Sequence, residues 1–175
     1  SWHKQMRAYQ LGDKGNSVPW KYYALCKKHG AIIAQGHEHS YSRTYTMENF
    51  EKFKVANRSN TLQVGGGKSF TFTNGLGGAS IRRQVLCKKK DSCPWWASIY
   101  TRDQGAKNGA LFCTFNYKGV ENKAKCQFKN VDGKVIDEFD VESLNKTNGV
   151  ASDILREKPD VIWYPTELAN REDLW

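Results

Sequence analysis

The chain has 175 residues, of which 39% are hydrophobic and 13% aromatic, and 27 Lys+Arg against 18 Asp+Glu give a formal net charge of +9. This composition excludes a disordered or low-complexity chain and supplies enough apolar material for the core of one domain. No apolar run approaches the roughly 18 residues that a transmembrane helix needs, which argues against a membrane span.

The first region, residues 1–47, is predicted to contain one helix and one strand. We expect a helix over residues 20–29 that stops at Gly30, because glycine readily adopts the left-handed conformation that follows a helix. The apolar run 31–35 predicts a buried strand. This strand leads directly into the segment Gly36-His37-Glu38-His39.

Residues 60–141 predict a region rich in β-strands, separated by turns that contain glycine. The expected strands cover residues 62–64, 69–73, 97–101, 111–117, 124–129 and 135–141. From residue 142 the sequence loses its alternation of polar and apolar residues and contains two prolines. We therefore expect a domain over residues 1–141 and an extended C-terminal tail over residues 142–175.

Four of the five cysteines are predicted to form two disulfide bonds. A hairpin with its turn at residues 119–120 places Cys113 opposite Cys126, and opposed residues on neighbouring strands are close enough for a disulfide. Cys87 and Cys93 enclose a short loop that contains three lysines, and a bond between them would hold that loop together. These two pairs are the predicted bonds.

The remaining cysteine, Cys26, is expected to be free or bonded outside this chain. Two glycosylation sequons, at Asn57 and Asn145, agree with the cysteines in favouring a secreted glycoprotein. The alternative is a cytosolic protein with five reduced thiols. The first residues lack the apolar segment of a signal peptide, so we expect the chain to start downstream of the beginning of its gene.

The two histidines after the predicted strand are candidate metal ligands. His37 and His39 are separated by one residue and can point in one direction, and neutral imidazole is a preferred ligand of zinc and iron. They do not form the helical His-Glu-x-x-His motif of zinc proteases, because Tyr41 stands four residues after His37. A histidine pair with ordinary hydrogen bonds, at the surface or in the core, remains the alternative.

The stretch Gly30 to Thr44, which contains Gly-His-Glu-His followed by Tyr41 and Arg43, resembles the last conserved block of the calcineurin-like metallophosphoesterases. This superfamily includes the purple acid phosphatases. The segment Ser1-Trp2-His3-Lys4 resembles the preceding block, in which a single histidine ends a strand, and residues 70–78 are similar to the strand and glycine turn that follow. The resemblance covers about residues 1–140.

The resemblance implies an α/β fold, namely half of a four-layer α-β-β-α sandwich, with this portion rich in mostly antiparallel strands. It also implies a site for two metal ions, each Fe, Zn or Mn. His3 and His37 would bind one ion and His39 the other, so we expect His37 and His39 to face the same cavity and His3 to lie close enough to share a metal ion. The implied function is that of a metal-dependent phosphoester hydrolase, similar to an acid phosphatase, acting on a phosphorylated substrate.

The chain lacks three earlier family blocks, D-x-H, G-D-x-x-[DY] and G-N-H-[DE]. Two metal ions about 4 Å apart need bridging carboxylates, and three neutral imidazoles supply no negative charge. We therefore expect the other ligands to come from the N-terminal half of the same domain or from a second chain. The isolated chain is expected to bind metal weakly and to be inactive.

A second function from a different class stays open. The chain could be a non-catalytic secreted module that keeps the phosphatase scaffold for assembly, and a homo-oligomer is one form of it. Nucleic-acid binding is disfavoured, because the basic segments around Lys88-Lys89-Lys90 accompany no known nucleic-acid module. The neighbouring pair Trp95-Trp96 is expected to be a core or interface anchor.

Overall fold

The structure is a computed structural model, and it describes residues 1–89 and 92–145. The helical segments are η1 (Arg7–Tyr9), α1 (Trp20–His29), η2 (Arg102–Gln104) and η3 (Tyr117–Gly119). The strands are β1 (Ile33–Gln35), β2 (Tyr41–Thr44), β3 (Thr46–Asn49), β4 (Lys54–Asn57), β5 (Thr61–Val64), β6 (Thr71–Asn74), β7 (Trp96–Tyr100), β8 (Gly109–Phe115), β9 (Lys123–Asn130) and β10 (Val135–Ser143). None of the helices among the described residues has the length and apolar character needed to cross a membrane.

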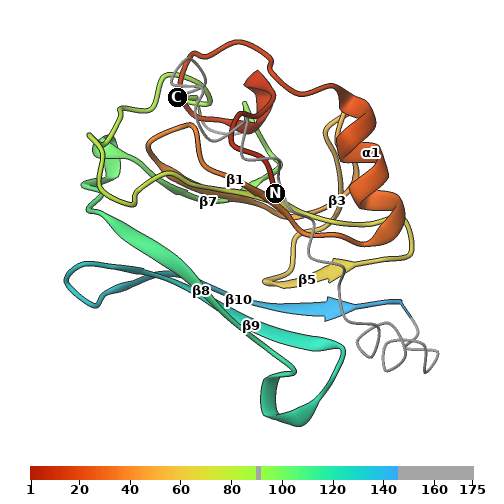
Figure 1. The fold of residues 1–175 in the computed structure, drawn as a ribbon. Coiled ribbons are helices and arrows are strands. Elements are labelled where there is room, and N and C mark those ends of the chain that lie inside the picture. The colour runs from red at the N-terminus through yellow and green to blue at the C-terminus, as the bar shows by residue number, and fades with distance from the viewer. Residues whose placement is uncertain (90–91, 146–175) are drawn as a thin grey trace, which may run out of the picture. The chain divides into compact units, whose positions relative to one another are not determined.

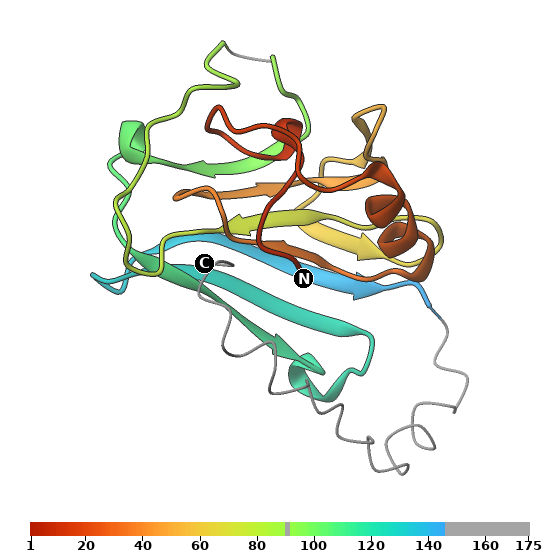
Figure 2. The ribbon, with the colours of Figure 1, turned by 45° about the horizontal axis from the view of Figure 1, so that its top comes forward.

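The strands form two four-stranded sheets and one two-stranded pair. The first sheet has the order β1-β6-β2-β7, the second has the order β5-β10-β9-β8, and β3 pairs with β4. The pairs β1/β6 and β5/β10 are parallel, whereas the other pairs are antiparallel. Figures 1 and 2 both show strands β8 to β10 below the first sheet. A mostly β structure with mixed sheets and one α-helix is consistent with the expected α/β class, and the four-layer order stays a prediction.

The sequence predicts helix α1 correctly from Trp20 to its stop at Gly30. Pro19 precedes the helix in an extended conformation, so its missing amide proton costs no helical hydrogen bond. Gly30 has φ 68°, and its amide donates to the carbonyl of Lys27 at 3.3 Å. A residue with a side chain would be strained there, which explains why the helix ends at this glycine.

The hairpin of β8 and β9 has the predicted register. Cys113 lies opposite Cys126, Leu111 opposite Phe128, and Phe115 opposite Ala124. Cys113 and Cys126 stand at disulfide distance, with their Cα atoms 4.1 Å apart.

The second predicted pair also stands at disulfide distance, since the Cα atoms of Cys87 and Cys93 are 5.4 Å apart. Cys26, on helix α1, is free and half-buried. The pattern of two pairs and one remaining thiol is therefore present in the described part of the chain, which contains all five cysteines.

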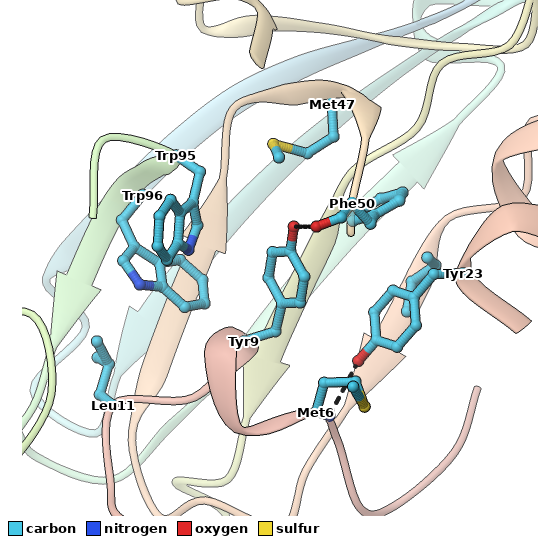
Figure 3. Packing of buried hydrophobic residues seen from close by; sticks show 9 residues of the cluster. Met6, Tyr9, Leu11, Tyr23, Met47, Phe50, Trp95 and Trp96 are labelled. Carbon is cyan, nitrogen blue, oxygen red and sulfur yellow. Dashed lines mark hydrogen bonds between the residues drawn. The ribbon is translucent and has the colours of Figure 1, made fainter. Parts of the chain in front are cut away.

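Two apolar clusters bury the two faces of the first sheet. Between the sheets, residues of β5, β9 and β10 pack with residues in and directly before β6: Leu62, Val64, Phe70, Phe72, Ala124, Cys126, Phe139 and Val141. On the other face, aromatic residues of η1, α1 and the β3–β4 turn pack against β7 (Figure 3). There the hydroxyl of Tyr9 donates to the carbonyl of Phe50 at 2.7 Å, and the amide of Met6 donates to the hydroxyl of Tyr23 at 3.2 Å. Trp95 and Trp96 are buried in this cluster, as the sequence indicates.

Three strands, β2, β3 and β4, are not predicted by the sequence pattern. The four residues of β2 are all buried although three of them are polar, so no alternation marks the strand. The compact unit runs from Ser1 to Asn145. Most of the expected tail, residues 146–175, lies outside the described residues.

Both sequon asparagines lie in the described part. The Asn57 amide, at the end of β4, donates to Gln63 Oε1 at 3.4 Å. The Asn145 amide donates to the His29 carbonyl at 3.2 Å. Glycosylation of either residue stays a prediction.

Candidate metal centre

The N-terminal residues run beside the edge of β1 and bring His3 to the Gly-His-Glu-His segment. The amide of Trp2 donates to the carbonyl of Ala34 at 3.2 Å. The carbonyl of His3 accepts from the amides of Gly36 and His37, at 3.2 and 2.9 Å. Backbone pairing therefore joins two histidines that are far apart in the sequence at the end of one strand.

The imidazoles of His3 and His37 touch each other. His3 Nε2 and His37 Nδ1 are 3.1 Å apart, and the ring centroids are 4.9 Å apart. Two nitrogens at this separation, each about 2.1 Å from one zinc ion, subtend an angle of about 95° at the ion, which zinc or iron coordination accommodates. At this distance the two nitrogens can also share a hydrogen bond, and joint ligation of one metal ion stays a prediction.

The protonation state of His37 favours ligation. Burial lowers the pKa of His37 to about 4, and the positive charges of Lys14, His3, Lys4 and Arg82 act in the same direction. The imidazole is therefore neutral at physiological pH, and the neutral ring is the form that binds metal.

His39 is oriented by a separate contact. Its Nδ1 lies 2.9 Å from the carbonyl oxygen of Ser80, and a carbonyl only accepts, so Nδ1 carries the proton. The lone pair then lies on Nε2, which is available to a ligand or a metal ion. A common cavity for His39 and the other two histidines stays a prediction.

The described residues contain no complete metal site. Within residues 1–89 and 92–145, no group of three or more His, Cys, Asp and Glu side chains could hold a metal ion. A metal site that uses His3 and His37 and takes bridging carboxylates from elsewhere stays a prediction.

Sequence reasoning missed the buried charge in the middle of this segment. Glu38 is fully buried, and neither of its carboxylate oxygens has a hydrogen-bond partner among the described residues. Its nearest cation is Arg82, whose Nη1 lies 3.6 Å from Oε2. Burial raises the pKa of Glu38, and the charges of Arg82 and Lys14 oppose that shift. Only its position between two histidines could have indicated a role, because nothing in the sequence links it to Lys14 or Arg82.

Comparison with known proteins finds a solved structure with a similar fold. The fold resembles that of a purple acid phosphatase. The solved structure is that of purple acid phosphatase PPD1 from yellow lupin (Lupinus luteus) seeds, with a TM-score of 0.61 and 16% sequence identity. The match covers 81% of this chain and 24% of the lupin chain, so this chain spans about a quarter of that protein.

No protein-family model matches the sequence, and no curated protein matches it. At 16% identity, the structural likeness shows a shared fold and supports a distant relationship. It agrees with the resemblance in the histidine blocks, which rests on different information, namely the order and spacing of a few residues.

Proposed function

We propose that this chain is the C-terminal part of a metallophosphoesterase domain and hydrolyses phosphoesters together with polypeptide that supplies the missing ligands. The observation that carries the proposal is the 3.1 Å contact between His3 Nε2 and His37 Nδ1 at the end of β1. The likeness of the fold to that of a purple acid phosphatase supports the proposal.

In the proposed site, His3 and His37 hold one metal ion and His39 contributes to the second. The ions, each Fe, Zn or Mn, would lower the pKa of an attacking water and bind the phosphoryl oxygens. The residues of this chain orient the site: the His3 carbonyl fixes the backbone of His37, and the Ser80 carbonyl fixes the tautomer of His39. The carboxylate ligands would come from polypeptide outside these 175 residues, and three quarters of the lupin chain has no counterpart here.

The two cysteine pairs support an oxidising compartment, so we also propose that the protein is secreted. Glycosylation at Asn57 and Asn145 belongs to the same proposal. Mapping of disulfides and glycans on material from its natural source tests it.

Zinc binding by the 175-residue chain tests the histidine pair. In competition with a chromogenic chelator, His3→Ala and His37→Ala should each weaken zinc binding about tenfold or more, because each removes half of the pair. His29→Ala is the control, since His29 lies at the end of α1 and should leave zinc binding unchanged. Equal zinc affinity in all four proteins would refute the proposed pair.

Hydrolysis of an aryl phosphate tests the activity. The complete protein should hydrolyse the ester with Zn²⁺ or Mn²⁺, the His39→Ala variant should lose this activity, and the 175-residue chain alone should be inactive. Activity of the isolated chain that falls in His39→Ala would show that no outside ligands are needed. A complete protein that binds zinc without hydrolysis would favour the non-catalytic scaffold.

A further inference from the structure

Two basic residues are hydrogen-bonded to the backbone of the histidine segment, Lys14 through its side chain and Arg82 through its amide. Lys14 Nζ donates to the carbonyl of His37 at 2.8 Å. The amide of Arg82 donates to the carbonyl of His39 at 3.0 Å, in the same loop whose Ser80 carbonyl contacts the His39 ring. Loops from two distant parts of the sequence thus bring Lys14 and Arg82 to the histidine segment.

The buried carboxylate of Glu38 lies between these loops. A Cβ atom on Gly12 would overlap Glu38 Oε2, so the loop that carries Lys14 packs directly on the carboxylate. Arg82 approaches the same oxygen at 3.6 Å. A buried carboxylate without hydrogen bonds is costly unless nearby cations compensate it. Glu38 therefore acts as the counter-charge of Arg82, while the His37 carbonyl holds the ammonium of Lys14.

The two cations keep hydrogen-bonding capacity that the described residues do not use. The Arg82 side chain is 41% exposed, and its contact with Glu38 is an ion pair longer than a hydrogen bond. A guanidinium has five N–H donors, and the ammonium of Lys14 has three, of which one is used by the His37 carbonyl. One carboxylate also leaves one of the two positive charges unbalanced.

We propose that Lys14 and Arg82 form a binding site for a tetrahedral oxyanion, the phosphoryl group of the substrate, beside the histidine pair. Glu38 is a positioning residue for this site. The planar fork of Arg82 suits two phosphoryl oxygens, and Lys14 adds a point charge. This inference rests on the proposed function and deepens it, because it names the side chains that hold the substrate group independently of the metal ligands.

Binding of inorganic phosphate to the 175-residue chain, measured by calorimetry at constant ionic strength with and without zinc, tests the site. Arg82→Gln and Lys14→Gln should each weaken phosphate binding about tenfold, since each removes charge-assisted hydrogen bonds. Arg82→Lys should weaken it less than Arg82→Gln, because it keeps the charge and loses the fork. Lys21→Gln, on α1, removes the same charge elsewhere and should bind phosphate as the unaltered chain does.

Zinc affinity and thermal unfolding of the same variants separate this site from the metal centre and from misfolding. Retained zinc binding and an unchanged melting temperature, with weakened phosphate binding, support the oxyanion site. Phosphate affinity in Arg82→Gln and Lys14→Gln equal to that of Lys21→Gln overturns it, whether or not zinc binds. Phosphate binding that needs Arg82 in a chain that fails to bind zinc would refute the proposed metal centre and leave the oxyanion site standing.

Discussion

Replacing Asp137 with Asn removes the counter-charge of a fully buried arginine that joins the two sheets. Arg43 on β2 is 1% exposed, and its Nε and Nη2 donate to Asp137 on β10 at 2.7 and 2.9 Å. The Tyr41 hydroxyl donates to the same carboxylate at 2.7 Å. The guanidinium also lies over the ring of Phe139, 4.4 Å from its centroid. Asp137 therefore accepts three hydrogen bonds, two of them from a charge that cannot reach water.

We expect the Asp137→Asn substitution to lower the free energy of unfolding by about 3–5 kcal/mol, the usual cost of leaving one partner of a buried ion pair uncompensated. Arginine does not lose its proton in proteins, so Arg43 would stay charged and the loss of stability would not be reduced by deprotonation. Each kcal/mol lowers the melting temperature of a domain of this size by about 2–4 °C, so the expected decrease is about 6–20 °C.

Urea unfolding followed by circular dichroism measures the change. Asp132→Asn is the matched control, because Asp132 is 51% exposed and pairs with Lys107 at the surface, where an ion pair contributes at most about 1 kcal/mol. The double change Arg43→Met with Asp137→Leu should recover most of the lost stability, since no unpaired charge remains. A loss below about 1 kcal/mol in Asp137→Asn would refute the reasoning.

Three further predictions concern other parts of the chain. A thiol reagent should titrate one cysteine per unreduced chain, Cys26, and it should react slowly because burial raises the pKa of this thiol; a second reactive thiol would contradict the two disulfides. Gly12→Ala should lower the melting temperature, because its Cβ would meet the Glu38 carboxylate, whereas Gly15→Ala, with open space around it, should not. Phe128→Ala should cost about 3–5 kcal/mol in urea unfolding, against little for Phe112→Ala, which starts 60% exposed; similar values for both would show that the packing around Phe128 is not as described.

The sequence determines the features that depend on neighbouring residues. Helix α1 ends where Gly30 permits a left-handed conformation, and the turn of the β8–β9 hairpin sets which residues face each other, which in turn pairs Cys113 with Cys126. The position of His37 and His39 just after an apolar strand also follows from local pattern. These features can be predicted without the tertiary structure, because the conformation of glycine and the two-residue period of a strand depend on only a few neighbouring residues.

The tertiary structure decides which distant residues meet and which charges lose contact with water. The pattern of polar and apolar residues does not predict strand β2, because a buried arginine is not expected from sequence. Arg43 is buried only because Asp137 of the other sheet pairs with its charge. The contact of His3 with His37 depends on pairing of the N-terminal residues with β1. Glu38 meets its counter-charge, Arg82, from a loop that is distant in the sequence. Contacts between residues that are far apart in the sequence depend on how the whole chain folds. Because burial removes water from these polar groups, their stability then depends on the partners that the fold brings to them.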